Sequence, residues 1–260
     1  MVTDKGDTGA RTGRESALAE EYGGMTGAIE SAIRYPAESD DVVKTVLIGG
    51  VLAVFSFLVV PLFVLAGYLV RVFDRTVAGD EVPPAFDEFS EMTVTGIKAT
   101  VIGIVYGFVP LAVGIAAVLV GVAGVGIGVA GDGAVAGLGV LVAVVGGILW
   151  FALALLVGYL LPAALANFAQ TRSIGSGFDV GTLKPIWTSR SYAVAWVTMF
   201  AVLLIGGFVT AVLNAVPILG TVAGAFVGFY FSVAAYSVIG RLWSSFPVPG
   251  DVRSGSSDAV

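Results

Sequence analysis

Four stretches of this sequence run without a single charged side chain. They are Thr45–Val70, Ala99–Gly131, Gly133–Thr171 and Ser191–Gly240. A helix that crosses a membrane needs about 20 consecutive apolar residues, so each stretch is long enough to cross at least once. The chain is therefore predicted to be an all-α, polytopic integral membrane protein built from helical hairpins.

The overall composition supports a bilayer as the solvent. Hydrophobic residues make up 57% of the 260 positions and charged residues only 12%. A soluble domain carries about 25% charged residues, which is enough to coat its surface. This chain cannot coat itself with charge, so lipid must cover part of it, and the lipid bilayer is the first predicted partner.

Several kinds of chemistry are excluded by the residues that are missing. The chain has no cysteine and no histidine, which removes Cys/His zinc sites, cysteine nucleophiles and His-based triads. The uncharged stretches also lack the buried carboxylates that proton relays and membrane aspartyl proteases use. We therefore expect no enzyme activity, no catalytic residue, no metal and no cofactor. A net charge of −6 without a basic block predicts no nucleic-acid partner.

Turn signals divide the longer stretches into hairpins. Asn214–Pro217 splits the last stretch into helices at 191–213 and 217–240, with Pro217 in the first turn of the second. Gly131-Asp132-Gly133 separates two further segments, predicted at 99–130 and 134–161. Both of these arms exceed one membrane thickness. We therefore expected Gly121–Gly139 to be partly loop or re-entrant, and Pro162 to end or kink the second arm.

The first hydrophobic segment, 45–70, is ambiguous because Pro61 lies in its second half. It is either one tilted span or a short helix–turn–helix that enters and leaves on one side. Cytoplasmic loops collect Lys and Arg. A segment that does not cross puts all 13 basic residues on one side, whereas a crossing segment divides them. We therefore favour four full spans plus a Pro-broken first segment, with both tails cytoplasmic, over five single spans.

Polar sequence flanks the predicted membrane domain of residues 42–243. Residues 1–41 and 244–260 are predicted to be disordered tails, the first of them acidic. Acidic, lysine-poor tails fit a protein kept soluble in strong salt, and they also fit an ordinary acidic tail.

Two amphipathic stretches before the arms predict interfacial helices, with Asp87 and Asp179 as their N-caps. Their apolar residues recur at helical spacing: Phe86, Phe89, Thr93 and Ile97 in the first, and Val180, Leu183 and Trp187 in the second.

Small and polar residues within the arms are the candidate site residues. Small residues let helices approach closely in lipid. The helix-packing candidates are Gly220, Gly224, Gly228, Gly103 and Gly107. These glycine faces fit packing within one chain, an oligomer interface or a pore lining. Asn167 and Asn214 are the candidates for a polar path.

An ordered string of residues resembles a known family. The string includes Ile33-Arg34-Tyr35-Pro36, Val43-Lys44-Thr45-Val46-Leu47-Ile48-Gly49-Gly50 and Gly67-Tyr68-Leu69-Val70-Arg71-Val72, with Val60-Pro61 between them and Pro83-Pro84-Ala85-Phe86 after them. It resembles domain-of-unknown-function family 4013, multi-spanning membrane proteins common in salt-loving archaea. The resemblance covers roughly residues 28–245. It implies an archaeal cell membrane and a halophilic host, and it implies no activity and no functional residue.

The residues therefore favour a non-enzymatic function: a membrane scaffold, a lipid-organising subunit or a partner-binding subunit. A homo-oligomer or another membrane protein is the possible protein partner. The alternative is a permease or channel component for a neutral or small solute, which needs a cavity lined by side chains such as Asn167 and Asn214. An intramembrane enzyme is the third and least favoured function.

Overall fold

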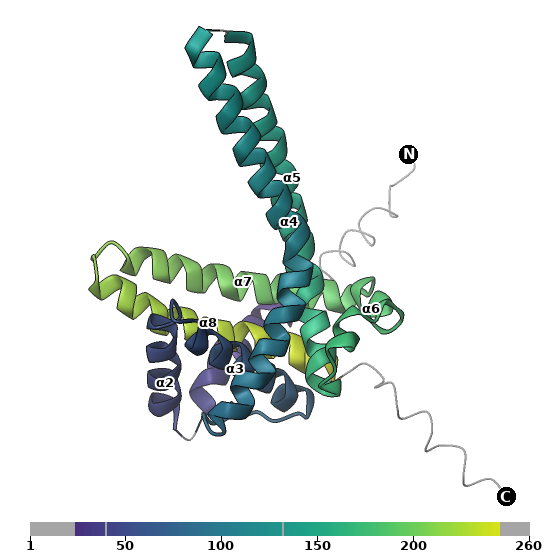
Figure 1. Cartoon of the computed structure of the whole chain (residues 1–260). Helices are drawn as coiled ribbons and strands as arrows, with labels where there is room; N and C mark the ends of the chain where they lie inside the picture. Colours follow the sequence, from purple (N-terminus) through teal and green to yellow (C-terminus); the bar gives the residue numbers. More distant parts are fainter. Residues whose placement is uncertain (1–23, 40, 132, 245–260) are drawn as a thin grey trace, which may run out of the picture.

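The structure, a computed structural model, describes residues 24–39, 41–131 and 133–244, and the regular secondary structure in these residues is helical (Figure 1). Four of the described helices are long and apolar enough to cross a membrane. They are α4 (Phe89–Gly131), α5 (Gly133–Thr171), α7 (Arg190–Leu213) and α8 (Leu219–Trp243). The predicted all-α class with four long apolar spans is confirmed.

The first hydrophobic segment is divided into two helices, α2 (Val42–Val54) and α3 (Val59–Val77). Residues 55–58 form the break, which comes before Pro61. Pro61 itself lies in the first turn of α3, where a missing N–H costs nothing. Neither helix is among the candidate spans of the described chain, so the structure agrees with a broken first segment rather than with a fifth span.

The glycine-rich region between 121 and 139 was expected to be partly loop, and this expectation is wrong. One arm is helical up to Gly131 and the other is helical from Gly133 onward, and Asp132 between them lies outside the described residues. The glycines instead bring the two helices together: a Cβ on Gly124 would lie 2.7 Å from the Cα of Gly139. In lipid such close backbone contact replaces the hydrophobic effect as the source of helix association, so glycine is retained inside these helices.

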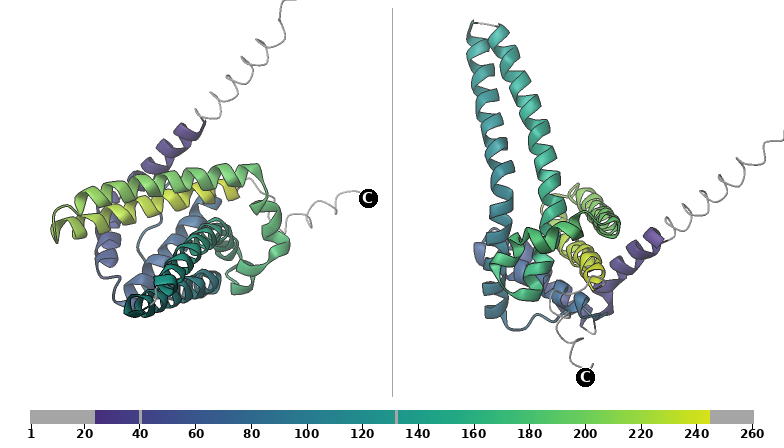
Figure 2. Two further views of the ribbon diagram at one scale, coloured as in Figure 1. Left: turned by 90° about the horizontal axis from the view of Figure 1, so that it is seen from above. Right: turned by 90° about the vertical axis from the view of Figure 1, so that its right-hand side faces the viewer.

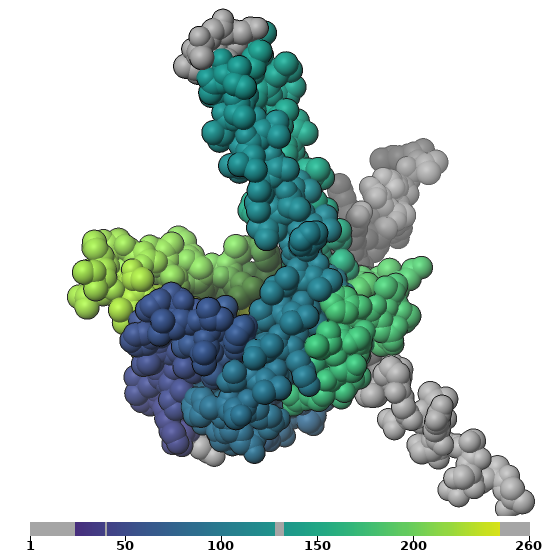
Figure 3. Space-filling model, in the orientation of Figure 1, coloured from purple at the N-terminus to yellow at the C-terminus, as the bar shows by residue number. Residues whose placement is uncertain are grey.

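The α4–α5 hairpin projects from a helical base (Figures 1 and 3). The α7–α8 hairpin leaves the same base in a different direction, and the two hairpins diverge widely (Figure 2). The part of α4 beyond Pro110 measures roughly 33 Å at 1.5 Å per residue, close to the ~30 Å thickness of a bilayer's hydrocarbon core. The projecting part of this hairpin is therefore long enough for one crossing in each direction.

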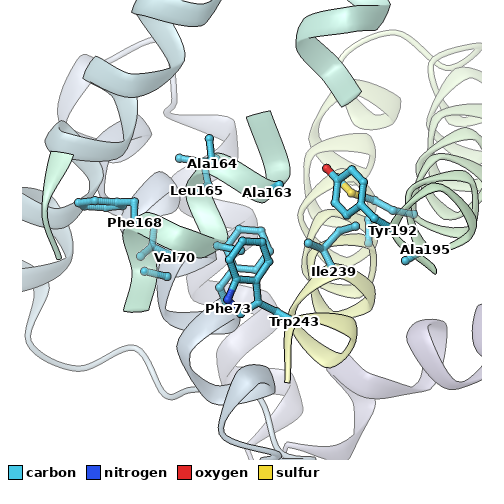
Figure 4. Packing of buried hydrophobic residues seen from close by; sticks show 14 of the residues in the cluster. Val70, Phe73, Ala163, Ala164, Leu165, Phe168, Tyr192, Ala195, Ile239 and Trp243 are labelled. Carbon is cyan, nitrogen blue, oxygen red and sulfur yellow. The ribbon is translucent and has the colours of Figure 1, made fainter. Parts of the chain in front are cut away.

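The base is held together by a core to which α3, α5, α7 and α8 all contribute (Figure 4). Phe73, Phe168, Tyr192 and Ile239 are fully buried there, and Trp243 closes its edge. α5 reaches this core because it continues through Pro162 to Thr171. The expectation that Pro162 ends the helix is therefore wrong.

Glycines set the closest helix contacts in the base. At the crossing of α3 and α4, a side chain on Gly67 would overlap the Met92 carbonyl, and one on Gly96 would overlap the Phe63 carbonyl. On α2, Gly49 faces the ring of Phe229 from α8. Small residues at these positions let helical backbones touch, which fixes how the base elements cross.

The second predicted interfacial helix is present and the first is not a separate helix. α6 (Val180–Trp187) begins at Asp179, whose carboxylate accepts hydrogen bonds from the backbone N–H groups of Gly181 and Thr182. The hydroxyl of Thr182 also donates to this carboxylate at 2.8 Å, and this bond, together with the backbone bonds, lowers the pKa of the Asp179 carboxyl. The predicted cap Asp87 instead pairs with Arg71, and Phe89 begins the long helix α4 itself. The prediction of Asp87 as an N-cap is wrong because an arginine on α3 binds this carboxylate.

The turn between α7 and α8 also differs in detail from the prediction. Pro217 precedes the new helix rather than lying in its first turn, because α8 begins at Leu219. Ile218 before it has a φ of 67°, a left-handed conformation that is strained for a β-branched residue.

Candidate functional site

Three successive carbonyls of α5 accept hydrogen bonds from aromatic side chains just before Pro162. Trp196 donates its indole N–H to Gly158 O at 2.8 Å, and Tyr192 donates its hydroxyl to Tyr159 O at 2.5 Å. Trp187 donates its indole N–H to Leu160 O at 3.2 Å. We call these three donors, from α6 and α7, the aromatic clamp.

The position of Pro162 explains why the clamp is needed. A proline has no N–H, so the carbonyl four residues earlier, Gly158 O, loses its helical partner. An unpaired carbonyl inside a membrane protein costs free energy, and neighbouring side chains normally satisfy it. Trp196 supplies that partner here. The clamp therefore ties α7 to the point where the α4–α5 hairpin leaves the base.

The clamp shows what these aromatic residues do in the fold. Trp187, Tyr192, Trp196 and Trp243 lie near the ends of the arms, where aromatic side chains often anchor a protein at the membrane interface. Tyr192 and Trp243 are buried, and the indoles of Trp187 and Trp196 point at backbone carbonyls. The sequence does carry a signal for the clamp: a proline four residues after a carbonyl, followed by Trp and Tyr on a later helix.

Charged side chains gather at the base around Arg71 of α3. Its guanidinium pairs with Asp87, Glu88 at 3.0 Å and Glu91 at 3.6 Å. The arginine side chain is only 14% exposed, whereas the three carboxylates are more than half exposed. This arrangement joins α3 to the start of α4. Exposed pairs of this kind stabilise weakly, so the cluster fixes geometry more than it adds stability.

A second ion pair links distant parts of the chain. Arg172, which follows α5 and has a φ of 56°, pairs with Asp74 of α3 and donates to the hydroxyl of Thr95 on α4 at 3.3 Å. Burial raises the pKa of Asp74 to about 6, and the nearby Arg172 charge and hydrogen bond only partly oppose this. One arginine thereby holds three helices at the base.

The Asp74 carboxyl predicts a pH dependence of stability. The pKa of this carboxyl is higher in the folded chain than in the unfolded chain, so its protonation stabilises the fold. This contribution to the unfolding free energy is fully present below about pH 4 and is lost as pH rises through about 6. We expect Asp74→Asn to remove about 2 kcal/mol of this pH-dependent change in unfolding free energy. Denaturation in detergent at pH 4 and pH 7 measures it. An unchanged difference between the two pH values in the variant would contradict this assignment.

Asn167 and Asn214, the predicted polar path, are not brought together. Asn167 is buried at the base, where its amide donates to Ser176 O at 2.9 Å and fastens the loop after α5. Asn214 ends α7 at the exposed α7–α8 turn and accepts from the hydroxyl of Thr221. Each amide has a local structural partner, and no described pocket is lined by both.

The predicted packing glycines fall into two groups. Side chains on Gly220 and Gly224 would meet the end of α7, at Leu213 O and Thr210 respectively. Side chains on Gly103, Gly107 and Gly228 would meet no described atom within 4 Å. The prediction that these three glycines pack against other helices of the chain therefore has no support. Gly67 and Gly96 make close contacts with the backbone of a neighbouring helix instead.

Several charged side chains of the base make structural contacts. Among the described residues, no three Asp or Glu side chains are placed to hold a metal ion. The acids that do cluster are engaged by Arg71, and Asp179 caps α6. What these groups do in the structure is fix the helices of the base relative to the two apolar hairpins.

A comparison with protein families gives one match. The model of the family described as "Protein of unknown function (DUF4013)" matches residues 54–215, which run from the last residue of α2 through α3, the α4–α5 hairpin, α6 and all of α7. No curated protein and no solved structure matches this chain.

Proposed function

Since this chain belongs to the DUF4013 family of proteins of unknown function, we propose from its own geometry that it is a non-enzymatic membrane scaffold. The α4–α5 hairpin is its working arm. Large apolar side chains are exposed on all sides of this arm, and the most apolar part of α5 buries none of its residues inside the chain. Surface of this kind must be covered by lipid or by the helices of another membrane protein.

The base supports the scaffold function as the part that positions the arm. Its aromatic core, the aromatic clamp and the Arg71 and Arg172 ion pairs all lie where the hairpins begin. A second copy of the chain or a different membrane protein is the partner that such an arm would contact. The alternative of a permease has less support, because the two amides proposed for its path are far apart in the fold.

The scaffold function can be tested by shortening the arm. Removing residues 117–127 and 137–147 takes 11 residues, or about three helical turns, from each helix and keeps the facing pairs in register. We expect the base to keep its melting temperature, because the removed residues pack only on each other. We also expect the shortened chain to fail to complement a strain that lacks the gene.

Two outcomes would contradict the proposal. Full complementation by the shortened chain would show that the arm has no function of its own. Loss of the folded base would show that the arm stabilises the chain instead of serving a partner. A matched control exchanges Leu119 and Leu141, both exposed on the arm, for isoleucine and should behave like the parent.

We propose that the base and both tails are cytoplasmic. Every described lysine and arginine lies in the base elements or at the base ends of the hairpins, as the positive-inside rule requires of a cytoplasmic face. Single cysteines at Asp4, Asp132 and Ser256 test this with an impermeant maleimide in intact cells. We expect only the Asp132 site to label from outside. Labelling of Asp4 and Ser256 from opposite faces would contradict the shared side.

We also propose an archaeal, halophilic cell membrane as the setting. The support is the excess of acid, with 19 Asp and Glu against 13 Lys and Arg. Self-repulsion among the acids should weaken the fold in dilute salt and be screened in strong salt. The expected result is a higher melting temperature in molar potassium chloride than in dilute buffer, and the opposite order would contradict it.

A further inference from the structure

An apolar groove lies where the two hairpins diverge. It has a volume of about 400 Å³ and is lined by one face of α5, including Trp150, Phe151 and Gly158, and by one face of α7, including Trp196 and Phe200. Tyr236 of α8 also lines it. The rings of Trp196 and Phe200 stack with their centroids 5.3 Å apart. Aromatic and aliphatic walls around a few hundred Å³ are typical of sites for apolar ligands.

The groove is elongated along α5. Its lining residues on this helix step from Trp150 to Pro162 at helical spacing, which corresponds to roughly 18 Å at 1.5 Å per residue. Pro162 is at the base, and Trp150 lies toward the tip of the hairpin. The long axis therefore runs from the charged base into the apolar arm, as a lipid chain runs from the headgroup level into the hydrocarbon core.

A single hydroxyl near the base end of the groove has no hydrogen-bond partner among the residues that the structure describes. Tyr236 carries the only hydroxyl among the lining residues, and no hydrogen bond joins it to any residue that the structure describes. Among the described residues, Thr210 Oγ1 is the fully enclosed side-chain polar atom that lacks a hydrogen-bond partner. The Tyr236 hydroxyl lacks a partner but is not fully enclosed, so it reaches the surface of the groove. A hydroxyl left unpaired at membrane depth is unfavourable, so it points to a ligand oxygen.

We propose that this groove binds one hydrocarbon chain of a membrane lipid, with an oxygen of the lipid's backbone accepting a hydrogen bond from Tyr236. The chain lies along α5 between Trp196 and Trp150. The lipid backbone lies at the base, on the side where the charged residues gather. Gly158 keeps the groove open, because it has no side chain and no described atom lies within 4 Å of a Cβ placed there.

This site goes beyond the scaffold function and does not depend on it. A bound lipid would fill the angle between the α4–α5 and α7–α8 hairpins and so help to set their relative orientation. Absence of the lipid would leave the arm's own exposed surface, on which the scaffold proposal rests, unaffected.

The test is lipid retention measured by native mass spectrometry. The full chain is reconstituted in nanodiscs of dioleoyl phosphatidylcholine and released into the spectrometer. We expect one lipid to remain on the parent chain. Gly158→Leu adds a side chain whose Cβ meets no described atom within 4 Å and whose remaining atoms occupy the groove. This variant should retain at least about fivefold less lipid. Gly107→Leu is the matched control: it adds the same side chain at another open glycine outside the groove and should retain lipid as the parent does.

Tyr236→Phe tests the oxygen contact. Because the hydroxyl bonds to none of the described residues, this variant should keep its melting temperature in detergent, while its lipid retention falls about fivefold. The proposal is overturned if the parent chain emerges without lipid, if Gly158→Leu retains as much as the parent, or if both glycine variants lose lipid equally. Equal retention by Tyr236→Phe would overturn the assigned position of the lipid oxygen.

Discussion

Gly67→Leu is expected to lower the unfolding free energy by about 3 kcal/mol or more, which is the largest effect of any single substitution that we predict. A side chain at this position overlaps the carbonyl of Met92, which belongs to the backbone of α4 and cannot rotate away. Helices α3 and α4 would have to separate, and the pairing of Arg71 with the acids at the start of α4 would be disturbed with them.

The measurement is the thermal midpoint in detergent, compared with that of Gly103→Leu. Gly103 lies on α4, the helix that Gly67 of α3 contacts, but no described atom lies within 4 Å of a Cβ added at Gly103. We expect this control to stay within about 0.5 kcal/mol of the parent. Similar midpoints for both variants would mean that the crossing at Gly67 and Gly96 does not hold the base together.

Tyr192→Phe is expected to cost about 1–3 kcal/mol, the second largest effect. The variant keeps the buried ring and removes only the hydroxyl that donates to Tyr159 O. That carbonyl is next in sequence to Gly158 O, which lacks a helical partner because Pro162 has no N–H. Deleting the hydroxyl removes a buried hydrogen bond next to the weakest point of the α5 hydrogen-bond ladder, and water cannot replace this bond because Tyr192 is fully buried.

Tyr236→Phe serves as the comparison for the clamp, since it removes from the neighbouring helix α8 a hydroxyl that bonds to no residue in the described part of the chain. Unfolding of lipid-free chains in detergent should show Tyr192→Phe destabilised and Tyr236→Phe unchanged. A stable Tyr192→Phe variant would show that the break at Pro162 does not need the clamp.

The long helices could be predicted from the sequence because lipid makes the signal simple. A run without charge that is longer than one bilayer must be helical, since only a helix satisfies its own backbone there. The turn at Asn214–Pro217 and the N-cap at Asp179 were predictable for a local reason, because each depends on residues within a few positions.

The candidate site residues were harder to predict, because they depend on contacts between distant segments. Repeating glycines such as Gly103 and Gly107 match the small-residue pattern but face open space, whereas Gly67 and Gly96 are isolated in the sequence and meet at a helix crossing. Asp87 has the local sequence signature of an N-cap, and only the fold shows that it forms an ion pair with Arg71. Pattern alone cannot tell which face of a helix meets a neighbour.

The central claim, that the α4–α5 arm lies in the bilayer with its apolar side chains against lipid, has a direct test. The chain has no native cysteine, so single spin labels can be placed at Val118, Val122, Val145 and Ile148, all exposed on the arm. In reconstituted vesicles, electron paramagnetic resonance compares collisions with oxygen, which enters lipid, and with a water-soluble nickel chelate. The account predicts high oxygen and low nickel collision rates at all four positions. High nickel collision rates along the arm would place it in water and contradict the account.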